Sequence, residues 1–97
     1  MKLARQGDVL LVEVATIPGG CKKKDLTIAY GEVTGHHHTF DSGECLVSST
    51  GQQYVQLENP ANLTHQEHDT ITFQPGKDKV VLQREYDLVE GVRQVMD

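Results

Sequence analysis

The five histidines of this chain fall into two short groups. Three are consecutive, His36-His37-His38, and two more enclose a Gln-Glu pair in His65-Gln66-Glu67-His68. Residues two apart on a β-strand point to the same face, so we expect His36 and His38 to project together while His37 points away. Such a pair can place two imidazoles on one metal ion, and a third ligand from another strand would complete a site with an open position for water.

The second group can supply that third ligand. His65 ends a segment in which apolar and polar residues alternate, and it faces inward if the apolar residues do. His68 is a further candidate, and Glu67 or Glu44 offers a carboxylate as a ligand or as a base beside the ion. The candidate metal ligands are therefore His36, His38, His65, His68, Glu67 and Glu44.

A donor set of several imidazoles with one carboxylate suits zinc, iron, nickel or copper better than calcium or magnesium. Three consecutive histidines also bind such ions adventitiously. The alternative is that the histidines are turn residues, or a network bonded to Glu67, Asp69 and Asp41. Clustered imidazoles also titrate near neutral pH and repel one another once charged, so a pH switch is a third reading.

The stretch Gly31-Glu32-Val33-Thr34-Gly35-His36-His37-His38 resembles the first histidine motif of the cupins. These are small jelly-roll proteins in which an H-x-H pair, a glutamate and a later histidine hold a metal. The resemblance implies those four roles for His36, His38, Glu44 and either His65 or His68. The spacing to Glu44 departs from the cupin pattern.

The chain is also similar to a widespread group of small uncharacterised bacterial and phage proteins. The similar segments are Gly31 to His36, Thr64 to His68, and Gln83 to Tyr86. This similarity implies a prokaryotic or viral setting and carries no activity with it. It makes a virion decoration protein, or another oligomeric structural protein with histidines at a subunit interface, the main alternative to a metal-binding protein. An acidic inhibitor of a host protein complex is a third alternative.

The charge and composition of the chain limit the kinds of binding partner that we expect. The formal net charge of −5 repels a phosphate backbone, so we expect a protein partner or self-association rather than nucleic acid. Lys22-Lys23-Lys24 is the only basic run and is typical of a solvated loop. No apolar run is long enough to span a membrane and the first residues lack the pattern of a secretory signal, which predicts a cytoplasmic or virion protein with free thiols at Cys21 and Cys45. Whether the protein is an enzyme stays open: a metal-bound water activated by Glu67 or Glu44 would be the mechanism, but no catalytic residue can be assigned.

Short segments rich in β-branched residues alternate with turn residues along the whole chain, as in a small all-β protein. We predict one β-rich domain over residues 1–97, an antiparallel sandwich or barrel of the jelly-roll kind. The expected strands lie at 8–14, 26–33, 45–48, 53–57, 61–65, 69–73 and 79–86. A short C-terminal helix is predicted after Asp87, with an apolar stripe formed by Leu88, Val89, Val92, Val95 and Met96.

Overall fold

The computed structural model of the protein describes residues 3–30 and 35–82. These residues form ten strands and no helix. In chain order the strands are β1 (Leu3–Gln6), β2 (Val9–Glu13), β3 (Lys22–Lys24), β4 (Thr27–Tyr30), β5 (His37–Phe40), β6 (Glu44–Val47), β7 (Gln53–Leu57), β8 (Ala61–Thr64), β9 (Ile71–Phe73) and β10 (Gly76–Leu82). Every strand pair is antiparallel, so the prediction of an all-β antiparallel fold is confirmed.

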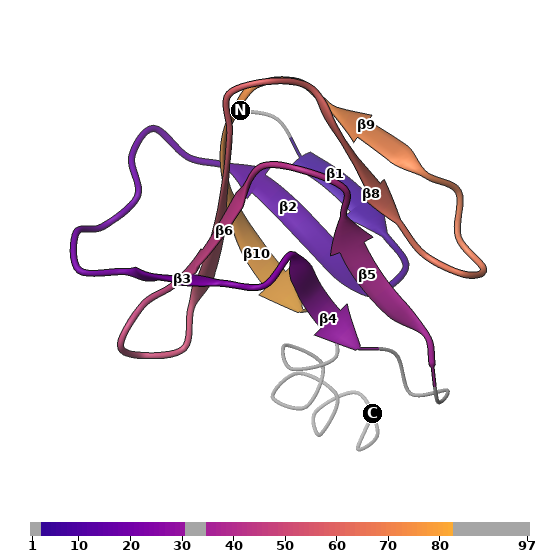
Figure 1. Cartoon of the computed structure of the whole chain (residues 1–97), viewed down its shortest axis with the longest axis horizontal. Coiled ribbons are helices and arrows are strands. Elements are labelled where there is room, and N and C mark those ends of the chain that lie inside the picture. The colour runs from indigo at the N-terminus through magenta and orange to yellow at the C-terminus, as the bar shows by residue number, and fades with distance from the viewer. Residues whose placement is uncertain (1–2, 31–34, 83–97) are drawn as a thin grey trace, which may run out of the picture.

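The strands make two sheets (Figure 1). One has six strands in the order β1-β2-β10-β7-β6-β3, and the other has four in the order β4-β5-β8-β9. The chain passes between the sheets several times, so segments far apart in sequence come together. One consequence is that the turn between β1 and β2 lies against histidines carried by β5 and by the loop after β8.

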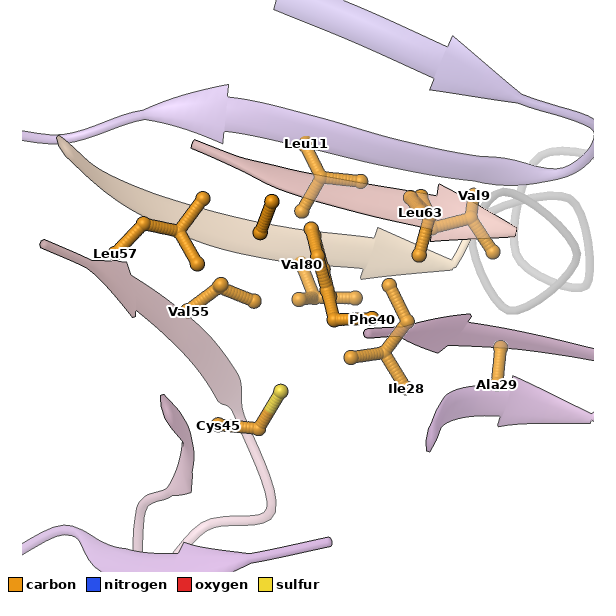
Figure 2. Close-up of a cluster of buried hydrophobic side chains, with 11 residues drawn as sticks. Val9, Leu11, Ile28, Ala29, Phe40, Cys45, Val55, Leu57, Leu63 and Val80 are labelled. Atoms are coloured by element: carbon orange, nitrogen blue, oxygen red, sulfur yellow. The ribbon is translucent and has the colours of Figure 1, made fainter. Parts of the chain in front are cut away.

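Both sheets contribute to one hydrophobic core. The six-stranded sheet supplies Val9, Leu11, Cys45, Val55, Leu57 and Val80, and the four-stranded sheet supplies Ile28, Ala29, Phe40, Ala61 and Leu63 (Figure 2). The rings of Phe40 and Phe73 meet edge to face with centroids 5.5 Å apart. Two polar side chains are buried as well, Gln6 and His38. A buried polar side chain requires hydrogen-bond partners, so we expect these two residues to be hydrogen-bonded within the interior.

Several predicted strands are present, with corrections. The β6–β7 hairpin, β8 and β9 fall where they were expected, and β2 lies within the expected strand at 8–14. The prediction of a loop at Lys22–Lys24 is wrong, because these residues form β3 and pair with β6. The strand expected at 79–86 begins earlier than predicted, since β10 starts at Gly76.

Two predictions concern parts of the chain beyond this description. The C-terminal helix after Asp87, and residues 31–34 of the first histidine motif, lie outside the described residues. Within the described ranges no helix is long and apolar enough to cross a membrane.

Candidate functional site

The pairing of β5 with β8 brings the two histidine groups together. Thr39 lies opposite Thr64 and Phe40 opposite Leu63. Continuing this register past the end of the ladder places His38 opposite His65, and the centroids of these two rings are 4.4 Å apart. Residues opposite each other in an antiparallel pair point to the same face, so the contact follows from strand register.

The same register continues along the chain. The backbone N–H of His37 donates to the side-chain oxygen of Gln66 at 2.8 Å. The Nδ1 atom of His36 lies 3.3 Å from Oε1 of Glu67. The segments carrying the two groups therefore run side by side, residue against residue, and the sequence prediction that they meet agrees with this geometry.

Four of the five imidazoles form what we call the histidine cluster: His36, His38, His65 and His68. His65 is central, with ring centroids 5.5 Å from His36 and 4.6 Å from His68. The rings of His38 and His68 are nearly parallel with centroids 6.1 Å apart. His37 is directed elsewhere, with its ring 6.3 Å from that of Tyr30.

His38 is the buried member of the cluster, with 1% of its surface exposed. Alternation along β5 turns His38 and Phe40 inward, and Gln6 at the end of β1 meets the imidazole inside the protein. The side-chain nitrogen of Gln6 donates to the carbonyls of Leu63 and Asp69 at 2.8 and 2.9 Å, so its oxygen must face His38. That oxygen lies 2.8 Å from Nδ1 of His38.

This contact sets the tautomer of His38. A glutamine oxygen only accepts hydrogen bonds, so Nδ1 of His38 must donate. In the neutral ring the lone pair is then on Nε2, which lies 3.6 Å from Oδ1 of Asp8. A ring nitrogen fixed in this way by a bond at the opposite nitrogen is the arrangement in which histidine ligates metals.

His65 is held in the opposite tautomer. Its Nδ1 accepts the backbone N–H groups of Glu67 and His68 at 3.0 and 3.3 Å, so the neutral ring carries its proton on Nε2. The imidazole thus closes the turn that presents His68. In this conformation His65 donates from Nε2 and does not ligate through it.

Electrostatics favour the neutral form of His65. Partial burial lowers its pKa below the ordinary histidine value, and the neighbouring imidazoles of His68 and His36 lower it further. The carboxylates of Glu67 and Asp8 act in the other direction. The cluster therefore resists protonation at its centre, and neutral imidazole is the form that binds metals.

The other candidate residues lie elsewhere. Glu44 is in β6 of the six-stranded sheet, and its carboxylate pairs with Lys23 at 3.2 Å. Asp41 binds the backbone and side chain of Asn62, both at 2.9 Å, and so fixes the start of β8. Across residues 3–30 and 35–82, no three His, Cys, Asp or Glu side chains stand in an arrangement that holds a metal ion as they are. Ligation by the histidine cluster would require at least one ring to turn.

A comparison with known protein families assigns the chain to one of them. Residues 5–83 match a family described as Domain of unknown function (DUF8820). The chain belongs to this family. Curated proteins and solved structures gave no match. The matched range includes both histidine groups, Gln6 and the turn between β1 and β2, so the site described here lies within the family's domain.

Sequence reasoning missed two residues of the site, Gln6 and Asp8. They enclose Gly7, and Gln6 pairs with Val9, so Gly7 and Asp8 form the tight turn of a hairpin. The signal available in the sequence was a Gly-Asp pair before the apolar run at Val9, which is typical of a hairpin turn. Nothing in the sequence indicated that this turn approaches the histidines.

Proposed function

We propose that this protein is a small β-sandwich whose histidine cluster binds one first-row transition-metal ion. The observation that carries the proposal is the buried, hydrogen-bonded His38, whose Nε2 lies 3.6 Å from a carboxylate oxygen of Asp8 and whose ring adjoins that of His65. Burying an imidazole with a fixed tautomer places a nitrogen lone pair at a defined point beside other donors. This is more specific than a run of exposed histidines.

The ring separations suit shared ligation. Two imidazoles on one tetrahedral ion have nitrogen–metal bonds of about 2.0–2.1 Å, which places their centroids roughly 5 Å apart. His65, which donates from Nε2, is not counted among these ligands, and the rings of His38 and His68 have centroids 6.1 Å apart. The ligands are thus near enough to share an ion after ring rotation, without movement of the strands.

The rings that would rotate on metal binding are those of the outer histidines, His36 and His68. His68 is exposed and follows a turn, so turning its ring disturbs little packing. His36 is already beside Glu67, which offers a nitrogen and an oxygen together at the rim of the cluster. His38 stays in place because its Nδ1 donates a hydrogen bond to the side-chain oxygen of Gln6.

Binding of a single ion is tested by titrating the untagged, metal-free protein with Zn²⁺ and measuring stoichiometry by calorimetry and elemental analysis. We expect one ion per chain, and loss of at least tenfold in affinity on His38→Ala or on His68→Ala. His37→Ala is the matched control, because it removes an imidazole from the same segment but one that contacts Tyr30 instead of the cluster. Equal losses in all three variants would identify adventitious binding to the histidine run and contradict the proposal.

Self-association is the second candidate function, and a surface groove favours it. A hollow of about 370 Å³ runs between the edge strands β1 and β9, and its lining includes Leu3, Leu11, Ile71 and Phe73. Leu3 is 65% exposed on β1, the edge strand of its sheet within the described part of the chain, where a second chain can add by backbone pairing. Light scattering of the wild type and of Leu3→Lys tests this: an oligomer that the substitution dissociates supports it, and a monomeric wild type contradicts it.

A further inference from the structure

The turn between β1 and β2 is pressed against the histidine cluster. Gly7 has φ of +59°, and a Cβ atom added there would lie 2.6 Å from Nε2 of His68 and 3.4 Å from Cε1 of His38. Only glycine fits such a contact without moving a ring. The next residue, Asp8, brings its carboxylate to the same place, where Oδ1 lies 3.6 Å from Nε2 of His38.

The 3.6 Å between Nε2 of His38 and Oδ1 of Asp8 can be compared with a hydrogen bond and with the spacing of two metal ligands. Hydrogen bonds between nitrogen and oxygen span about 2.7–3.2 Å, so these atoms are too far apart for one. Two ligands of one tetrahedral ion, with bonds near 2.0–2.1 Å, lie about 3.3 Å from each other. The Asp8–His38 pair is thus spaced close to adjacent ligands of a common ion, with a shift of a few tenths of an ångström.

We propose that Asp8 is a ligand of the metal and that the ion sits between Asp8, His38 and His68. This inference rests on the proposed metal-binding function and names its donor set: two imidazoles and one carboxylate. His38 provides the buried nitrogen, Asp8 the oxygen from the β1–β2 turn, and His68 the nitrogen from the loop after β8. Gln6, at the start of the same turn, positions His38.

The donor set defines the class of ion. Two neutral imidazoles and one carboxylate suit Zn²⁺, Fe²⁺ or Co²⁺ and leave room for water. A carboxylate is a poor ligand for Cu⁺, which prefers sulfur. The side chain of Asp8 is 37% exposed and that of His38 only 2%, so the carboxylate is the side from which solvent and the ion reach the buried nitrogen.

Asp8→Asn is the decisive substitution, because it keeps the size of the side chain and removes its charge. Glu44→Gln is the matched control: it neutralises another half-exposed carboxylate, the one that the cupin resemblance selects as the ligand. Both are titrated with Zn²⁺, and with Co²⁺, whose visible absorption reports the number and kind of ligands. Far-ultraviolet circular dichroism and thermal melting confirm that each variant is folded.

We expect Asp8→Asn to weaken Zn²⁺ binding at least tenfold and to alter the Co²⁺ spectrum, while Glu44→Gln leaves both unchanged. If Asp8→Asn binds as the wild type does and His38→Ala abolishes binding, the site is built from histidines alone; this inference is then overturned and the metal-binding function stands. If the wild type binds no stoichiometric ion, both fail. A loss on Glu44→Gln with none on Asp8→Asn also overturns the assignment of Asp8.

Discussion

Among the residues that the structure describes, two side chains capable of metal or nucleophilic chemistry are buried, His38 and Cys45, and each exposes 1% of its surface. His38 is bonded to Gln6, faces Asp8 and touches other imidazoles. Cys45 lies within the apolar cluster, where burial raises the pKa of its thiol to about 11 and keeps it protonated near neutral pH. Equal burial thus gives opposite chemistry, because the polar contacts around a group, more than its depth, decide whether it can react or bind.

Removing the support of His38 should have the largest effect. Gln6→Leu leaves Nδ1 of His38 and the carbonyls of Leu63 and Asp69 without their partner, and each buried unsatisfied group costs about 1–3 kcal/mol. We expect the free energy of unfolding to fall by about 3 kcal/mol or more in urea denaturation. Gln66→Leu, at an exposed glutamine, should cost less than about 1 kcal/mol. Similar losses in both variants would mean that the Gln6 network does not stabilise the interior.

Thiol labelling tests the contrast between the buried His38 and the buried Cys45. At pH 8 a thiol with a pKa of about 11 is ionised in roughly one molecule in a thousand, and its apolar surroundings also exclude reagent. We expect Cys21, which is partly exposed, to react with a disulfide reagent at least about a hundred times faster than Cys45 in the folded protein. Cysteine-to-serine variants assign the two rates. Comparable rates would show that the core opens readily around β6.

The close approach of Gly7 to the cluster predicts a smaller effect. Gly7→Ala forces a positive φ on alanine and pushes against His68, and we expect a loss of about 1–2 kcal/mol in stability together with weaker Zn²⁺ binding. Gly51→Ala is the control, since φ there is +90° but no atom lies within 4 Å of the added carbon. It should share the backbone strain and leave metal affinity unchanged. Unchanged metal affinity in Gly7→Ala would separate the turn from the site.

The smallest expected effect is the pH dependence of the metal-free protein. Because the pKa of His65 is lowered in the folded state, the unfolded chain binds this proton more readily. The stability contributed by neutral His65 is therefore complete above the ordinary histidine pKa of about 6.5, and it falls as pH drops below that value. Between pH 5 and 7 the carboxylates of Asp25 and Asp41, whose pKa values are lowered, stay ionised and do not contribute.

Urea denaturation at several pH values measures this slope. His65→Asn removes the titrating ring while keeping an acceptor for the turn after β8. We expect the variant to lose less stability than the wild type between pH 7 and 5. An identical slope in the two proteins would show that burial and the neighbouring imidazoles do not lower the pKa of His65 in the folded state.

Much of the strand pattern could be predicted from sequence because it rests on local signals. The β6–β7 hairpin, for example, is marked by two apolar runs around a turn containing Gly51. Three strands were missed: β5 (His37–Phe40), β1, which includes Arg5 and Gln6, and β3 (Lys22–Lys24). Among the described residues β1 and β3 are edge strands that each pair with one neighbour, which leaves little hydrophobic pattern to read.

Some residues of the candidate site could likewise be predicted from the sequence and others could not. Alternation placed His36 and His38 apart from His37, and the apolar neighbours of His65 placed it inward, so the meeting of the two groups could be expected from the chain itself. Asp8 and Gln6 could not be found in this way, because their contacts join β1 and its turn to residues some thirty and sixty positions away. Glu44 was selected as a carboxylate close along the chain and again by resemblance, and the structure places it in the other sheet.

By itself, the sequence determined an antiparallel β protein with its imidazoles gathered in two groups, since side-chain alternation and turn residues act over a few positions. Only the tertiary structure decided which nitrogen of His38 carries the proton and which carboxylate stands beside it. Those features depend on the register of β5 against β8 and on the crossing of the chain between sheets. Contacts of that kind are set by packing of the whole core, and no local pattern encodes them.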